Sequence, residues 1–156
     1  MFYMKKELQE KLFIKYPKIF RQKDLSSQET CMSWGITCGD GWYILIDTLC
    51  EAIQQRVQFI NGQKILVKSD IVRLVPVEQP SKMICEAVQV KQKYGGLRFY
   101  TEGEDDFIRG LISMAESMSY TVCETCGKSG KPTKTRWVKT LCQECEEKRY
   151  ICNPEI

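Results

Sequence analysis

The amino-acid sequence predicts an α+β fold: an antiparallel sheet of hairpins packed on helices, followed by a C-terminal zinc-ribbon module. Three observations support this prediction. Apolar residues recur at helical spacing near the N-terminus and over residues 105–118, glycine-containing turns separate alternating runs in between, and two Cys-x-x-Cys pairs follow. We expect an α+β body over residues 1–118 and a ribbon docked on it over residues 119–152.

The composition is that of a globular chain, with 43% hydrophobic and 28% charged residues among 156. The net charge of +3 is too small to indicate a nucleic-acid partner by itself, but lysine and arginine are concentrated in residues 1–23 and 127–141. No apolar run is long enough to cross a membrane, and the first residues do not resemble a secretory signal. We therefore expect a cytoplasmic location, where paired cysteines favour metal binding or redox chemistry over structural disulfides.

Two helices are expected in the N-terminal part of the chain. Leu8, Leu12 and Tyr16 recur at helical spacing, and Pro17 ends or bends this first helix. A second helix is expected over residues 42–55, because apolar residues again recur every three or four positions there. Asp40 stands just before it and is expected to be its N-cap.

Two hairpins are expected between the helices. Asn61-Gly62 is a typical two-residue turn between β-branched runs, and residues 72–77 form a weaker strand that Pro76 confines to an edge. A second hairpin is expected to turn at Gly95-Gly96, since apolar and polar residues alternate on both sides of it. One face of this sheet should therefore be covered.

The third expected helix, over residues 105–118, has the clearest apolar stripe. The acidic run at residues 102–106 precedes it and complements the positive end of a helix. The alternative is that Asp105 and Asp106 bind a divalent cation or act as catalytic carboxylates. Helix capping explains these residues more simply.

The four thiols of Cys123, Cys126, Cys142 and Cys145 predict a metal site. Fifteen residues separate the two pairs, which is enough for a short hairpin between two metal-binding turns. Four thiolates suit Zn²⁺ best, and a closed set of four indicates a structural metal. Iron, or a redox or disulfide role, are the alternatives.

The other five cysteines are expected to have different roles. Cys50 and Cys85 lie in apolar stretches and should be small buried side chains. Cys31 and Cys38 leave open a second metal site, and Cys152 is close enough in sequence to compete as a ligand.

Catalysis is not expected, and the sequence predicts a protein that is not an enzyme. The chain contains no histidine, which excludes a Ser-His or Cys-His pair and a histidine-ligated hydrolytic zinc. It also contains no P-loop, no dinucleotide-binding glycine pattern and no Gly-x-Ser-x-Gly elbow.

A partner-binding surface is expected where cations alternate with aromatic residues. In the ribbon, such a segment can hold phosphates and stack a base, and on the second hairpin the polar face can extend it or contact a protein. The alternative for Trp137 is that it packs the ribbon against the body. The candidate residues are Arg98, Tyr100, Lys131, Lys134, Arg136, Trp137 and Lys139.

Several stretches together resemble one family. They are "KYPKIF", "GDGWYILIDTLC", "VKQKYGGLRFYTEG", "MAESMSYTVCETCG" and "WVKTLCQEC", and their order is similar to that of small, mostly uncharacterised proteins common in phage and prophage genomes. The resemblance implies a phage-encoded protein acting in the cytoplasm of a bacterial host, and it implies no defined activity.

Two functions are compatible with these expectations. The first is a non-enzymatic accessory protein that binds and inhibits or modulates a host protein or protein–nucleic-acid complex, including a host-defence complex (an anti-CRISPR-like role). The second is a zinc-ribbon protein of phage replication or transcription that binds DNA or RNA directly. The sequence leaves the oligomeric state open.

Overall fold

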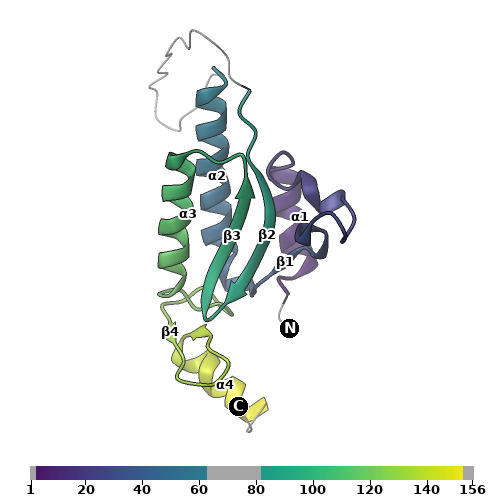
Figure 1. The fold of residues 1–156 in the computed structure, drawn as a ribbon. Helices are drawn as coiled ribbons and strands as arrows, with labels where there is room; N and C mark the ends of the chain where they lie inside the picture. The colour runs from purple at the N-terminus through teal and green to yellow at the C-terminus, as the bar shows by residue number, and fades with distance from the viewer. Residues whose placement is uncertain (1–2, 63–81, 153–156) are drawn as a thin grey trace.

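The structure of the protein is a computed structural model that describes residues 3–62 and 82–152 (Figure 1). It has four α-helices, a mixed three-stranded sheet and a separate two-stranded sheet, so the predicted α+β class is confirmed. The helices are α1 (Lys6–Lys15), α2 (Tyr43–Ile60), α3 (Asp106–Ser119) and α4 (Gln143–Cys152). The strands are β1 (Ile36–Thr37), β2 (Glu86–Lys93), β3 (Gly96–Glu102), β4 (Lys131–Pro132) and β5 (Thr140–Leu141).

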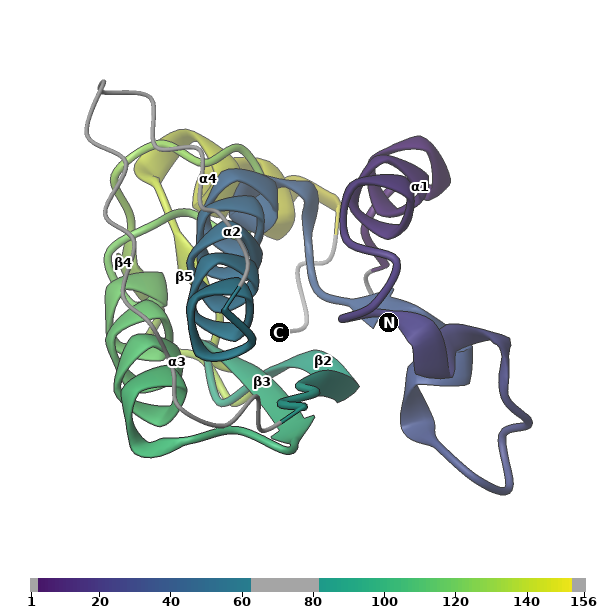
Figure 2. The same cartoon turned by 90° about the horizontal axis from the view of Figure 1, so that it is seen from above.

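The three-stranded sheet has the order β1-β2-β3. The strands β2 and β3 form the antiparallel hairpin that the sequence predicts, but β1 pairs with β2 in parallel, so the sheet is mixed and not wholly antiparallel. Figures 1 and 2 show α2 and α3 on the same face of the hairpin, while α4 lies with β4 and β5 beyond the end of the hairpin where the chain turns.

The turn between β2 and β3 lies one residue earlier than expected. Its central residues are Tyr94, with φ 52°, and Gly95, with φ 80°. Two positive φ values are typical of the type I′ turn, whose twist matches that of a two-stranded hairpin. Gly96 instead begins β3, where the ring of Tyr120 occupies the space that a side chain would need.

Both edges of the hairpin are hydrogen-bonded to other parts of the chain. On the β3 edge, Ser119 Oγ accepts from the backbone N–H of Leu97 at 2.8 Å, and Glu116 Oε1 accepts from that of Phe99 at 3.0 Å. On the β2 edge, Ala87 N donates to Ile19 O at 2.7 Å. Edge strands with free backbone groups invite pairing with another chain, and these contacts close that route.

The core lies between the hairpin and the helices. The buried face of the hairpin brings Val90, Leu97 and Phe99 against α2 and α3, and the ring of Phe20 meets that of Phe99 edge-on at 6.4 Å. The helices contribute the buried residues Ile46, Leu49, Ile53, Ile108, Ile112 and Ala115. The expected apolar stripe of α3 is thus confirmed at its centre.

The expected N-cap of α3 is present. Asp105 accepts a hydrogen bond from the backbone N–H of Ile108 at 2.8 Å and pairs with Arg56 Nε at 2.8 Å. Asp106 pairs with Arg109. Capping and pairing therefore account for both of the carboxylates for which a cation-binding or catalytic role was the alternative.

The expected turn at Asn61-Gly62 is wrong as a hairpin. Helix α2 continues to Ile60, so the residues before the turn are helical, and Asn61 is the residue that ends the helix. Its side chain donates to Met83 O at 2.9 Å and accepts from Met83 N at 2.7 Å, which ties the helix end to the segment entering β2. The expected weak strand at residues 72–77 lies outside the described residues.

Asp40 is not the N-cap of α2. A 3-10 turn over Asp40–Trp42 precedes α2, and no side chain caps the helix. Asp40 instead accepts a hydrogen bond from the backbone N–H of Lys5 at 2.8 Å, which holds the start of α1. Sequence position alone cannot distinguish these two uses of one carboxylate.

The β3 edge generates a prediction. Replacing Ser119, which is fully buried, by alanine leaves the Leu97 N–H without its acceptor. We expect Ser119→Ala to lower the free energy of unfolding by about 1–3 kcal/mol, the cost of an unsatisfied buried donor. Urea denaturation measures this, with Ser117→Ala as the control, since Ser117 is exposed on the same helix. Equal stability of the two variants would contradict the edge contact.

Candidate metal centre

The four predicted thiols come together. The Sγ atoms of Cys123, Cys126, Cys142 and Cys145 all lie within 4.8 Å of one another, and those of Cys126 and Cys142 are 3.6 Å apart. A tetrahedral metal with bonds of about 2.3 Å to sulfur separates its ligands by about 3.8 Å. The donor set and its spacing therefore fit a metal ion. Among residues 3–62 and 82–151 this is the one such cluster.

Each pair is positioned by a different local structure. Cys123 and Cys126 lie on a turn after α3, where Gly127 N donates to Cys123 O at 2.9 Å and Gly127 has φ 78°. Cys142 follows β5, and Cys145 lies in the first turn of α4, a helix that no pattern in the sequence predicted.

The second pair thus has the context of a redox motif, at a helix N-terminus after a strand. Its thiols are nevertheless gathered with those of the first pair, which a two-cysteine redox site does not require. The arrangement as a whole is that of a four-ligand metal site.

The protein environment favours ionisation of one thiol in particular. Burial raises the pKa of Cys123, but hydrogen bonds from the backbone N–H groups of Cys142, Cys126 and Thr125 outweigh it and lower the pKa to about 7. At Cys145, burial and the neighbouring thiols raise the pKa. Four thiols this close oppose one another's ionisation, because each thiolate would repel the next. A cation bound between the sulfur atoms offsets that repulsion.

The "GDGW" segment, residues 39–42, holds the first cysteine turn through hydrogen bonds and close backbone contact. Gly41 N donates to Glu124 O at 2.8 Å, and Trp42 Nε1 donates to Val122 O at 2.8 Å. A Cβ on Gly41 would overlap the carbonyl oxygen of Cys123 and lie 2.8 Å from Cys126 N. Two backbones therefore approach so closely that only glycine fits.

A buried ion pair lies beside the "GDGW" segment. Glu124 is 2% exposed, and Lys139 Nζ lies 3.3 Å from its Oε2, while Gly39 N donates to its Oε1 at 3.1 Å. The side chain of Lys139 is itself only 15% exposed. Lys139 therefore neutralises a buried carboxylate that also binds the backbone of the "GDGW" segment.

Cys31, Cys38, Cys50 and Cys85 are not part of the cluster, and the side chain of Cys152, the possible competing ligand, lies outside the described part of the structure. Cys50 and Cys85 are buried, as expected, and burial raises the pKa of Cys85 to about 12. Cys38 is buried as well and Cys31 is exposed, and within the described part of the chain these two form no metal-binding group.

The predicted partner-binding residues fall into three groups. Tyr100 is 41% exposed and lies on the hairpin. Arg98 and Lys139 make internal contacts, since Arg98 Nη2 donates to Tyr120 Oη at 3.0 Å. The remaining four are exposed on the ribbon, and we call them the ribbon platform: Lys131, Lys134, Arg136 and Trp137. Their binding role stays a prediction.

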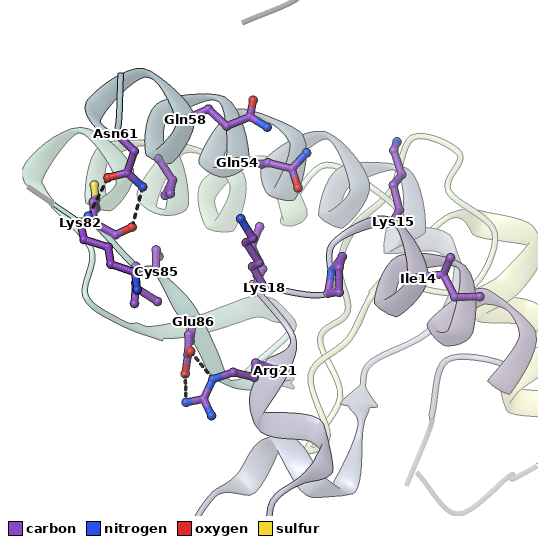
Figure 3. Close-up of a pocket in the computed structure, with 15 residues that line it drawn as sticks. Ile14, Lys15, Lys18, Arg21, Gln54, Gln58, Asn61, Lys82, Cys85 and Glu86 are labelled. Atoms are coloured by element: carbon purple, nitrogen blue, oxygen red, sulfur yellow. Dashed lines mark hydrogen bonds and ion pairs between the residues drawn. The ribbon is translucent and has the colours of Figure 1, made fainter. Parts of the chain in front are cut away.

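A cavity of about 880 Å³ lies on another side of the molecule, between the end of α1, α2 and the segment that enters β2 (Figure 3). Its walls combine apolar side chains with lysines and amides, and Lys18 points into it. Most of its charged groups are paired, because Lys15 binds Asp47 and Arg21 binds Glu86. Those three charged side chains, Lys15, Arg21 and Glu86, are therefore not free to bind a ligand there.

Comparison of the chain with protein-family models, with curated proteins and with solved structures gives no match. The resemblance to phage and prophage proteins therefore stays an expectation. Among the described residues, none of the helices has the length and apolar character that crossing a membrane requires.

Two glycine-to-alanine substitutions test the close contact between Gly41 and the first cysteine turn. We expect Gly41→Ala to destabilise the protein by about 1–3 kcal/mol or more, because the added methyl displaces the cysteine turn. Gly110→Ala is the control, since nothing lies near that exposed position in α3, and there alanine should add about 0.5–1 kcal/mol. Thermal and urea unfolding measure both. A Gly41→Ala variant as stable as the wild type would contradict the close backbone contact between Gly41 and the first cysteine turn.

Proposed function

We propose that this protein acts by binding and not by catalysis, and that its C-terminal segment is a platform held by a structural zinc ion. Four soft thiolate donors favour Zn²⁺ over hard cations. A set of four protein ligands leaves no open position for a substrate or water, as expected of a structural site.

The observation that carries this proposal is the exposure of Trp137 on an ordered loop. The side chain of Trp137 is 69% exposed, whereas its carbonyl oxygen accepts hydrogen bonds from Thr135 Oγ1 at 3.0 Å and Arg149 Nη2 at 3.1 Å. Thr133 N donates to Lys139 O at 2.7 Å and closes the loop. A fixed backbone that displays a tryptophan is typical of a binding surface, because little entropy is lost on binding.

The favoured partner is a host macromolecule, in a phage-encoded accessory protein that inhibits or modulates it. A nucleic-acid-guided defence complex is one such target. Tryptophan and arginine are enriched in the centres of protein interfaces, and the ribbon platform supplies both.

Direct nucleic-acid binding is a second candidate, and the charge of the platform favours it. Among the described residues, no carboxylate pairs with Lys131, Lys134 or Arg136, so their charge is available to an anionic partner. Free cations beside an exposed indole are suited to phosphates and bases.

Metal removal tests the zinc site. We expect purified protein to contain one zinc per chain. Stripping it should lower the melting temperature by more than about 10 °C, since structural zinc contributes on the order of 10 kcal/mol and each kcal/mol corresponds to about 3 °C. Cys123→Ser should abolish zinc binding, while Cys31→Ser, at an exposed thiol outside the cluster, should not. Metal-free wild-type protein with an unchanged melting temperature would exclude a structural zinc.

Capture from a bacterial host lysate tests the platform. We expect Lys134→Glu/Arg136→Glu to reduce capture of the partner by about tenfold or more. The control is Lys11→Glu/Lys18→Glu, which makes the same change of charge at two exposed lysines of the N-terminal region. Capture that survives nuclease treatment supports a host protein, and capture that nuclease abolishes supports the second candidate. Equal capture by both double variants would contradict a binding role for the platform.

A further inference from the structure

The outward face of the β2–β3 hairpin places like charges opposite each other. Lys91 and Arg98 are direct cross-strand partners, and Lys93 lies two residues further along β2 on the same face. Cations in direct opposition destabilise a sheet. Glu116 Oε2 lies 3.9 Å from Arg98 Nη1. In the described part of the chain, no carboxylate pairs with Lys91 or Lys93. This arrangement suits an anion that is not part of the chain.

Aromatic rings accompany each of these cations. Lys91 Nζ lies 5.5 Å from the ring centre of Tyr100, and Lys93 Nζ lies 5.4 Å from that of Tyr94. The guanidinium of Arg98 lies 6.0 Å from the ring centre of Tyr120. We call these six residues the hairpin face: Lys91, Lys93, Tyr94, Arg98, Tyr100 and Tyr120.

Tyr94 is not explained by the turn that contains it. Its φ of 52° is unfavourable for a tyrosine, and the first position of a type I′ turn favours asparagine, aspartate or glycine. The side chain of Tyr94 is 75% exposed, so packing of the ring does not offset the backbone strain. A strained, exposed aromatic residue is a feature of binding sites.

A partner can reach the hairpin face, but it can contact only the side chains there. Figures 1 and 2 show α2 and α3 on the opposite face of the hairpin. Because Ser119, Glu116 and Ile19 occupy backbone groups of the hairpin edges, a partner strand cannot readily extend the sheet there. What remains is a surface of rings and cations.

We propose that the hairpin face binds single-stranded nucleic acid, with bases stacked on its tyrosines and phosphates held by its lysines. This proposal rests on the proposed binding function in its second form and names the partner. Stacking requires bases that are not already stacked and paired, so a single strand is favoured over a duplex. A purely acidic protein surface would use the cations but not the exposed rings.

The tip of the hairpin is joined to the ribbon. Gln92 Nε2 donates to Val138 O at 2.9 Å, and Thr140 Oγ1 donates to Gly95 O at 2.7 Å. These bonds join the tip of the hairpin to the segment that carries Trp137.

Fluorescence anisotropy with labelled oligonucleotides tests the proposal. The probes are a 20-nucleotide oligo-dT, the corresponding oligo-U and a 20-base-pair duplex, each with the full chain at low and moderate salt. We expect both single strands to bind more tightly than the duplex. Tyr100→Ala should weaken single-strand binding by about tenfold, the loss of one stacked base, and Tyr100→Phe should retain it.

The lysines are tested by the salt dependence of the affinity. Lys91→Met/Lys93→Met should reduce the slope of log affinity against log salt by about 1.4, the loss of two phosphate contacts. The control Lys11→Met/Lys18→Met removes the same charge from exposed positions elsewhere and should leave the slope unchanged. Melting curves of all variants establish that they are folded.

Several results would overturn the proposal: no single-strand binding at low salt, tighter binding to the duplex, or equal effects of the two lysine double variants. The proposed function is tested separately by capture through the ribbon platform. If Lys134→Glu/Arg136→Glu abolishes capture of a nuclease-resistant partner while oligonucleotides do not bind, the inference fails and the proposed function stands. If oligonucleotides bind through the hairpin face but capture is unaffected by the ribbon variant, the proposed platform fails.

Discussion

The contact between the "GDGW" segment and the first cysteine turn is the constraint on which the C-terminal part of the structure depends. Gly41 and Trp42 bind the backbone on either side of Cys123, and Glu124 reaches back to Gly39. The turn that holds two of the four thiols is thus fixed to the start of α2. A metal bound by the four thiols would extend that fixation to β5 and α4.

This contact explains how a small ribbon can be held rigidly beside a larger body. The hairpin tip adds a second attachment, because Gly95 O accepts from Thr140 Oγ1 and Val138 packs against Gly95. The first attachment is at the cysteine turn and the second is at the start of β5. The loop between β4 and β5 carries Trp137, whose side chain remains exposed.

Local signals in the sequence were sufficient for much of the fold. The helix over α3, the hairpin around Gly95 and the four thiols could be predicted, because each depends on a short-range pattern of apolar residues, turn residues or ligands. The continuation of α2 to Ile60 could not, because Asn61-Gly62 is equally suited to ending a helix and to turning a hairpin. The backbone contact of Gly41, the parallel pairing of β1 and the burial of Lys139 depend on residues far apart in the chain, so no local pattern indicates them.

The platform depends on our proposal that the four thiols of the C-terminal segment bind one zinc ion. X-ray absorption spectroscopy of the purified protein at the zinc edge tests it most directly. The account predicts a single shell of four sulfur atoms at about 2.3 Å. A zinc edge absent from the folded protein, or a shell dominated by oxygen and nitrogen, would contradict it.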